Sequence, residues 1–271
     1  MSPPSNKPTT ARPKARPAAR GWRFGRRLHA RLGAERVRVE LRTRSGQVEF
    51  EQEIEFGNAQ AGLGQAAEAL GAGLAALRER AGSLRRMRCD IVVADSWMLY
   101  DVVRADLRSL SPRAADELIG ASLADVAGVQ AGELLTRWQA QGSGQCTLAC
   151  GLPAEVVPAI ERALGTHGLR VGSIEGEFVH EYNRHRSKLD APRAVVALVR
   201  EAGSQLAIIV DGVLTAMSFE LGVRAPEELE VRGRGLLRVA GLGDAEATRF
   251  YAMLPKGWLP PAPWVALPQG A

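Results

Sequence analysis

The sequence contains few of the residues that form disulfides, provide large aromatic core side chains or often act in catalysis. Its 271 residues include three cysteines, four histidines and 5% aromatic residues. Cys89, Cys146 and Cys150 are too few and odd in number for a disulfide framework, and a chain of this length can bury a core without one. No run of about 18 apolar residues predicts a membrane-spanning helix, and no apolar segment of a secretory signal follows the basic N-terminus. These absences together predict a protein of the reducing cytoplasm.

Charge is divided unevenly along the chain. Residues 1–44 contain 13 Lys or Arg and 2 Asp or Glu, a net charge of +11, whereas the remainder is net −6. An argument for nucleic-acid binding from the high pI of about 9.5 therefore concerns only the N-terminus. Residues 1–30 are rich in proline and basic residues and have little to bury, which predicts a disordered tail. The candidate arginines for contacts of this arm are Arg20, Arg23, Arg26, Arg27 and Arg31.

Hydrophobic periodicity predicts an α/β region over residues 31–222. The preceding segment, residues 21–34, fits either the end of the tail or a first strand. Residues 36–43 and 48–54 alternate with period two, which predicts an antiparallel hairpin with one solvated face. The predicted helices cover residues 62–81, 111–127, 132–139, 153–167 and 178–186.

The remaining predicted strands are either short apolar runs, typical of buried strands, or segments that end at turn residues. They are residues 89–94 with 97–103 as an antiparallel neighbour, 145–150, 169–174, and a meander of 193–200, 205–210 and 213–221. Asp211-Gly212 is a strong hairpin pattern within the meander. We expect two subdomains in residues 31–222, with an approximate boundary between 110 and 190. Residues 223–271 are expected to be a C-terminal extension with a proline-rich end, and no internal sequence repeat is found.

Two glycine and histidine patterns resemble binding motifs but are better explained structurally. Gly62-Leu63-Gly64-Gln65-Ala66-Ala67 spells G-x-G-x-x-A, yet a dinucleotide site needs these glycines directly after a buried parallel strand. Here a charged, alternating strand and several loop residues come first. His180 and His185 flank an H-E-x-x-H-like segment that is one residue too long, because i,i+5 spacing rotates the second imidazole by about 140°. We therefore predict no metal site there.

Cysteine and aspartate patterns also lack catalytic support. Cys146 and Cys150 lie four apart on a predicted strand, about 13 Å from one another, which is too far for a shared metal or a disulfide. Asp95 and Asp101 flank predicted turns, where aspartate is common for local reasons. With no Ser/His/Asp order, phosphate loop or C-x-x-C pattern in the sequence, we predict no catalytic residues.

The order of elements resembles the actin-like ATPase superfamily, with its RNase H-like mixed sheets and flanking helices. In particular it is similar to assembly-platform proteins of the PilM and GspL type, from type IV pilus and type II secretion systems. The segment CTLACGLPAEVVPAIERALGTHGLRVGSIEGEFVHEYN, residues 146–183, resembles a strand with A-x-P, a helix, and a second strand with G-L-x-v. RMRCDIVVADSWMLYDVV, residues 86–103, resembles the v-x-v-v-l-p-d/s strand and its partner. The resemblance spans roughly residues 35–222 and implies an actin-like fold that is truncated relative to a full ATPase.

Departures from the family pattern concern the phosphate loops. Gly33-Ala34-Glu35-Arg36-Val37 stands where a G-I-D-x-G loop is expected and lacks the Asp-x-Gly turn. Val199-Arg200-Glu201-Ala202-Gly203 stands where D-x-G is expected, so the metal-associated Asp is missing and Glu201 is a weak substitute. Phosphate binding relies on glycine N–H groups and a carboxylate that holds Mg²⁺. The resemblance therefore implies a scaffold with no cofactor rather than an enzyme.

Three functions follow as expectations. The first is a cytoplasmic scaffold, peripheral to the inner membrane, whose partners are the cytoplasmic tail of a pilus or secretion membrane protein and an assembly ATPase. The second is a divergent ATPase that binds ATP and Mg²⁺ with Glu201 and Gly203 near the phosphates. The third is nucleic-acid or anionic-surface binding through the basic arm. The sequence leaves monomer and homodimer open.

Overall fold

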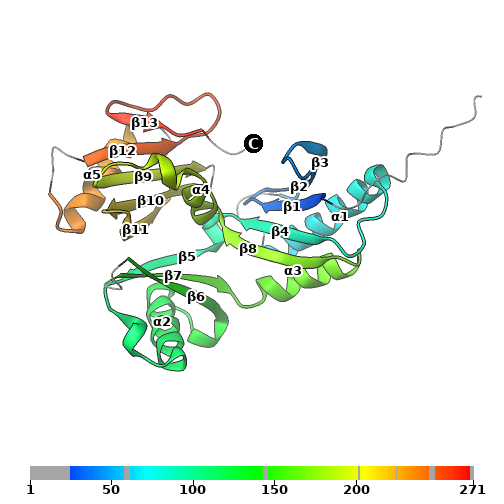
Figure 1. The fold of residues 1–271 in the computed structure, drawn as a ribbon, viewed down its shortest axis with the longest axis horizontal. Coiled ribbons are helices and arrows are strands. Elements are labelled where there is room, and N and C mark those ends of the chain that lie inside the picture. The colour runs from blue at the N-terminus through cyan, green and yellow to red at the C-terminus, as the bar shows by residue number, and fades with distance from the viewer. Residues whose placement is uncertain are drawn as a thin grey trace, which may run out of the picture.

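Two five-stranded sheets organise the chain. The computed structural model describes residues 25–57, 62–142, 146–200, 202–223, 225–243 and 248–268, so most of the expected tail lies outside the described residues. Figure 1 shows the two sheets as separate lobes, with a third, smaller sheet below them. No helix in the described part of the chain is long and apolar enough to cross a membrane.

The first lobe is built on a mixed sheet in the order β3-β2-β1-β4-β8. Its strands are β1 (Arg27–Leu32), β2 (Arg36–Arg42), β3 (Val48–Glu55), β4 (Arg88–Val93) and β8 (Arg170–Gly176). The first three are antiparallel neighbours, whereas β1, β4 and β8 run parallel. Helices α1 (Leu63–Ala81) and α3 (Val156–Gly165) cover one face. Leu70, Leu74 and Leu77 of α1 recur at helical spacing and are fully buried against this sheet.

The second lobe repeats this topology. Its sheet has the order β11-β10-β9-β12-β13, made of β9 (Arg193–Arg200), β10 (Gly203–Val210), β11 (Val213–Glu220), β12 (Thr248–Met253) and β13 (Trp264–Ala266). Again the first three strands are antiparallel, and β9, β12 and β13 are parallel. Asp211 and Gly212 have φ values of 49° and 77°, as a two-residue hairpin turn requires. The lobes are therefore a structural duplication that the sequence does not reveal.

Two helices flank the second lobe. Helix α5 (Glu228–Val239) follows β11 as α1 follows β3, and buries Leu229 and Leu237 against one face. Helix α4 (Glu177–His185) covers the opposite face through Phe178 and Tyr182. Residues 223–271 are thus no appended extension, because α5, β12 and β13 complete the second sheet and its core.

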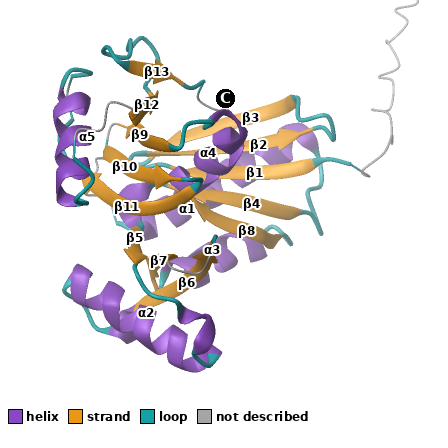
Figure 2. Ribbon diagram, turned by 60° about the vertical axis from the view of Figure 1, so that its left-hand side comes forward, coloured by secondary structure: helices purple, strands orange, loops and turns teal. Residues whose placement is uncertain are grey.

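A third, three-stranded sheet is inserted between β4 and β8. It has the order β5-β7-β6, with β5 (Leu99–Val103), β6 (Leu134–Gln141) and β7 (Cys146–Pro153), and helix α2 (Pro112–Ala127) packs on it. The Ser111 side chain accepts a hydrogen bond from the N–H of Ala114 at 3.2 Å and caps α2. Figure 2 shows this insert beneath the second lobe. Short 3₁₀ turns are η1 (Asp95–Trp97), η2 (Leu107–Ser109), η3 (Ala131–Glu133) and η4 (Arg186–Lys188).

One side chain ties the insert to the second lobe. The Gln141 carboxamide donates to the carbonyl of Leu214 at 3.1 Å and accepts from the N–H of Leu214 at 3.0 Å. Leu214 belongs to β11, the edge strand of the second sheet. The glutamine side chain therefore pairs with that edge as a neighbouring peptide unit would.

Three further sequence predictions need correction. The helix expected over 132–139 is strand β6, whose exposure alternates with period two and whose Trp138 Nε1 donates to Asp116 on α2 at 2.8 Å. Residues 97–103 do not pair with β4, because η1 turns the chain and β5 joins β7 in the inserted sheet. The tail boundary at residue 30 is too late, since β1 begins at Arg27. The hairpin, the β7-α3-β8 unit and the meander are confirmed.

Candidate functional site

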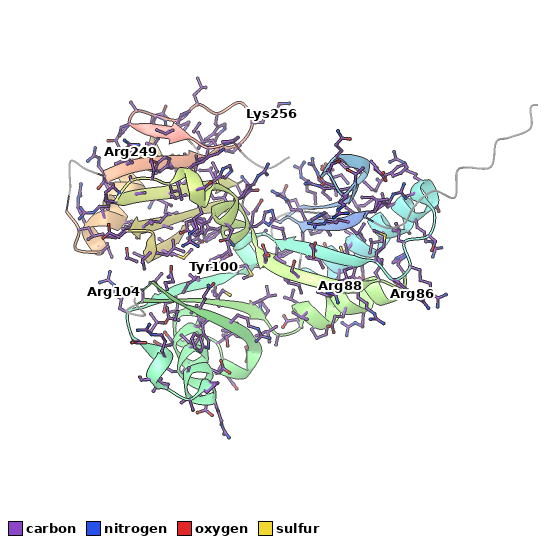
Figure 3. All side chains as sticks on the ribbon, in the orientation of Figure 1. Arg86, Arg88, Tyr100, Arg104, Arg249 and Lys256 are labelled. Carbon is purple, nitrogen blue, oxygen red and sulfur yellow. The ribbon has the colours of Figure 1, made fainter. Side chains whose placement is uncertain are left out.

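A cleft of about 500 Å³ separates the two lobes. The first lobe contributes the end of β1, the β1–β2 turn and Ala94 after β4, because the carboxyl ends of the parallel strands meet at this edge. The second lobe contributes the β9–β10 turn and residues 255–256. Glu177, the first residue of α4, also lines the cleft. Figure 3 labels Lys256 on the second-lobe side and Tyr100 near the junction with the insert.

The β1–β2 turn occupies the position of the expected first phosphate loop. The N–H of Gly33 donates to the carbonyl of Arg36 at 2.9 Å, so this donor closes the turn instead of facing the cleft. A Cβ at Gly33 would meet that carbonyl oxygen at 3.0 Å. Gly33 is therefore needed for the tightness of the turn.

The β9–β10 turn occupies the position of the expected second phosphate loop. Glu201 lies outside the described residues. Gly203 begins β10 with φ of 151°, and a Cβ there would lie 2.5 Å from the Phe219 ring. Gly203 lines a smaller cavity of about 20 Å³ beside the main cleft, together with Asp95 and Glu177. The Phe219 ring leaves no room for a Cβ at this position, which explains why residue 203 is a glycine.

Two arginines from different lobes converge on Glu177 beside the cleft. Arg31 of β1 lies 2.9 Å from Oε1 of Glu177, and the Nε of Arg200, at the end of β9, lies 2.7 Å from the same oxygen. Arg31 also donates to Glu181 of α4 at 3.2 Å. Both glutamates are buried, with 5% and 0% exposure. Because buried carboxylates need charged partners, these ion pairs connect β1, α4 and β9 at the junction of the lobes.

Asp95 is a second buried carboxylate at this junction. Both of its oxygens accept from the N–H of Phe178, at 3.0 and 2.9 Å, and Oδ1 also accepts from the Tyr100 hydroxyl at 2.7 Å. Burial raises the pKa of Asp95 to about 7, although these two hydrogen bonds oppose the shift. Asp95 thereby links the end of β4 to the first turn of α4.

The sequence-predicted arm residues separate in the structure. Arg20 and Arg23 lie outside the described residues. Arg26 pairs with Glu49 at 2.7 Å, and Arg27 is exposed at the start of β1. Arg31 belongs to the strand and not to an arm, because it lies in the cleft.

The other candidate ligands are also dispersed. His180 Nδ1 lies 3.2 Å from Glu175, whereas His185 is buried 3.9 Å from Glu181. Across the described ranges, no group of three or more His, Cys, Asp or Glu could hold a metal ion. From the sequence alone, Asp95 was explained as a turn residue, Arg200 was named only as part of the second loop, and Glu177 was not singled out. Asp95 follows a buried strand, which is a usable indication, but the pairing of Glu177 with two arginines leaves no local pattern.

Comparison with proteins of known structure shows which fold this chain has. No protein-family model matches the chain, and no curated protein matches it. The structure of a PilM-PilN type IV pilus biogenesis complex is 12% identical, with a TM-score of 0.58, over 84% of this chain and 80% of that one. The cytoplasmic domain of EpsL, an inner membrane component of the Vibrio cholerae type II secretion system, is 12% identical with a TM-score of 0.57, over 91% of both chains. A Bacteroides thetaiotaomicron protein with an actin-like ATPase fold and unknown function is 12% identical with a TM-score of 0.56, over 86% and 83%.

The chain therefore has the actin-like ATPase fold. Two of these three solved structures come from a type IV pilus and a type II secretion system, so the likeness in fold includes proteins of the systems that the sequence resemblance named.

Proposed function

We propose that this protein is a non-catalytic platform of an inner-membrane pilus or secretion complex, and that it binds the cytoplasmic tail of a membrane protein. The observation that carries the proposal is the Arg31–Glu177–Arg200 ion-pair group at the cleft where an actin-like ATPase would hold phosphates. The likeness to EpsL and to the PilM-PilN complex supports the choice of machine.

The ion pairs disfavour a nucleotide for an electrostatic reason. A phosphate that approaches Arg31 or Arg200 must compete with the Glu177 carboxylate, which already accepts from both guanidinium groups. Displacing Glu177 would leave a carboxylate with 5% exposure unpaired, at a cost of about 3–5 kcal/mol for breaking a buried pair. The Gly33 N–H is also engaged within its own turn. The first turn therefore does not offer this glycine donor to a phosphate.

A divergent ATPase remains the second candidate because the cleft is open and its rim includes Lys256 and Arg36. The test is a melting curve of the full chain with increasing Mg-ATP. A ligand at 100 times its Kd adds about 2.7 kcal/mol, which corresponds to about 5–10 °C for a chain of this size. We expect no shift up to millimolar nucleotide.

Two variants sharpen this test. If the wild-type protein shows a Mg²⁺-dependent shift that Arg200→Ala removes and Arg238→Ala retains, ATP binds in the cleft and the platform proposal loses its main support. Arg238 is a matched control because it is exposed at the end of α5 in the second lobe. Partner binding is tested separately by crosslinking and affinity purification from native membranes, followed by titration with the synthetic cytoplasmic tail of the recovered membrane protein. Recovery of no envelope component would contradict the proposal.

A further inference from the structure

Arginines gather at the end of the first lobe that faces away from the cleft. Because β1, β4 and β8 are parallel, their first residues share one edge. Those residues are Arg27, Arg88 and Arg170, all exposed. Arg88 and Arg170 are register partners. Arg27 precedes Leu28, whose partner is Cys89, so it lies beside Arg88. Like charges on adjacent strands repel, and the fold has no evident need for this row.

Three more exposed arginines lie next to the row. Arg85 and Arg86 occupy the loop between α1 and β4, and Arg44 follows β2. The Arg86 N–H donates to the carbonyl of Gly168 in the α3–β8 loop, which places the two loops together. Figure 3 labels Arg86 and Arg88 at this end of the molecule, far from Tyr100. We call Arg27, Arg44, Arg85, Arg86, Arg88 and Arg170 the basic face.

The basic face has no carboxylate partners among the described residues. Arg78 and Arg162 lie nearby in the last turns of α1 and α3, where a cation compensates the helix dipole. The six residues of the basic face have no such local role, since none lies in a helix. An uncompensated array of this kind indicates a polyanionic partner.

The N-terminal arm starts at the same end. Residues 1–24 contain six Lys or Arg and no Asp or Glu. They join the fold at Gly25, whose added Cβ would lie 3.3 Å from the Arg44 side chain. The described chain therefore begins at the same end of the molecule as the basic face.

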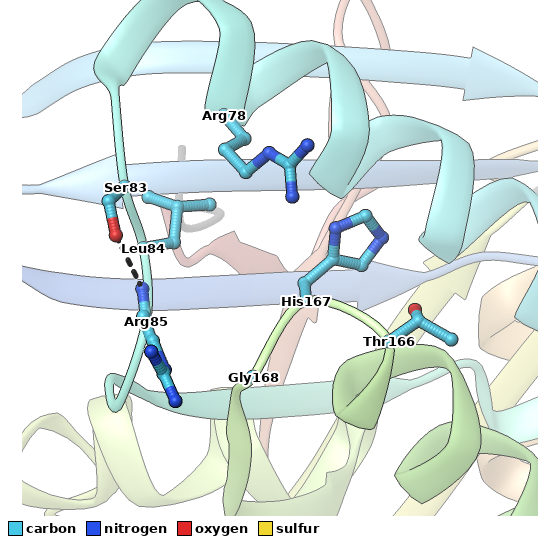
Figure 4. Close-up of a pocket in the computed structure, with 7 residues that line it drawn as sticks. All are labelled: Arg78, Ser83, Leu84, Arg85, Thr166, His167 and Gly168. Carbon is cyan, nitrogen blue, oxygen red and sulfur yellow. Dashed lines mark hydrogen bonds between the residues drawn. The ribbon is translucent and has the colours of Figure 1, made fainter.

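A pocket of about 260 Å³ adjoins the basic face. Arg78, Ser83, Arg85, Thr166 and His167 line it, and Figure 4 shows Arg78 and His167 on one side and Arg85 on the other. The Nδ1 atom of His167 is buried and has no hydrogen-bond partner among the described residues. Guanidinium groups, a hydroxyl and an imidazole are the side chains that bind phosphate oxygens.

We propose that the basic face, with this pocket, binds the phosphate groups of an anionic lipid surface. The choice of lipid over another polyanion rests on the proposed function at an inner membrane. The helices nearest to the face, α1 and α3, end there and offer no element for a DNA groove. Binding at this end directs the cleft away from the membrane.

The test is co-sedimentation of the full chain with vesicles of phosphatidylcholine containing 30 mol% phosphatidylglycerol, and with phosphatidylcholine alone. The face variant is Arg85→Gln/Arg88→Gln/Arg170→Gln. The control variant is Arg104→Gln/Arg137→Gln/Arg238→Gln, which removes the same charge from exposed positions elsewhere. Each near-surface arginine contributes about fivefold to binding an anionic surface, so the face variant should lose on the order of a hundredfold. The control should lose far less, and neither variant should have a lower melting temperature than the wild type.

Four outcomes overturn the proposal. The first is no difference between anionic and neutral vesicles for the wild-type protein, and the second is equal losses in the two variants. The third is binding to a 30-base-pair duplex that exceeds vesicle binding and disappears in the face variant, which would assign the face to nucleic acid. The fourth is displacement from vesicles by millimolar glycerol phosphate, which would assign the pocket to a free phosphate compound. None of these depends on the Mg-ATP or tail-binding results, so a failure here is distinguishable from a failure of the platform proposal.

Discussion

Replacing Asp95 with asparagine should remove much of the pH dependence of stability between about pH 4 and 7. The Asp95 carboxylate is 7% exposed, and burial raises its pKa from the ordinary 3.8 to about 7. Hydrogen bonds from Phe178 and Tyr100 lower the pKa, Glu177 raises it, and Arg200 lowers it, but burial is the largest cause. An asparagine side chain keeps an oxygen for the Phe178 N–H and carries no charge.

Proton binding determines whether stability rises or falls with pH. Between pH 3.8 and about 7 the folded protein keeps a proton on Asp95 that the unfolded chain has released, so stability falls as the pH rises. The stabilising effect of the raised pKa is fully present below pH 3.8 and is lost by about pH 7. A shift of about three units corresponds to about 4 kcal/mol in total. Between pH 5 and 8 the part lost is about 2.5 kcal/mol, or about 5–10 °C in melting temperature.

The measurement compares melting temperatures of the wild type, Asp95→Asn and Asp90→Asn at pH 5 and pH 8. Asp90 is a half-buried aspartate on the same strand that accepts from Ser173 at 3.2 Å, so its variant controls for the loss of an aspartate at the sheet. We expect Asp95→Asn to flatten the pH dependence and Asp90→Asn to retain it. If the wild type and Asp95→Asn lose the same number of degrees from pH 5 to 8, the reasoning about Asp95 is wrong.

Three further substitutions, one of them a control, test the local geometry. Gly176→Ala should destabilise the fold by about 1–3 kcal/mol, because its Cβ would lie 1.7 Å from the Tyr100 hydroxyl oxygen; urea denaturation measures this. Gly71→Ala is the matched control, since nothing lies within 4 Å of its Cβ inside α1, and it should stabilise by about 0.5–1 kcal/mol. Ser111→Ala should cost about 1 kcal/mol through loss of the hydrogen bond to Ala114, and an unchanged urea midpoint would contradict the role of the cap.

Local sequence patterns predicted most of the helices and strands, because turns and helix caps are determined by residues that are close together in the sequence. The β10–β11 hairpin was predictable from Asp211-Gly212, and α2 from Ser111-Pro112 at its start. Strand β6 was predicted as a helix because Leu134, Leu135 and Trp138 also fit helical spacing. In the structure the Trp138 ring lies against α2, so a tertiary contact decides the conformation.

The arrangement of the strands and the cleft could not be predicted from local sequence patterns. The repeated strand order arises from pairings such as β9 with β12, which join residues more than 50 positions apart. The resemblance to a known family supplied that topology instead. Arg31 and Glu177 are 146 positions apart, and no spacing rule connects them. The departures from the family's phosphate-loop patterns were visible in the sequence, but the ion pairs at the cleft were not.

The Gln141 carboxamide has a consequence for how the protein behaves in a crowded cell. An unpaired edge strand is a template on which a strand of another molecule can add, and aggregation by this route is a general hazard of open sheets. Gln141 occupies both hydrogen-bonding groups of Leu214 on the β11 edge. An incoming strand that pairs with Leu214 must displace the Gln141 side chain. One glutamine thus blocks this position of the edge without the need for an additional strand.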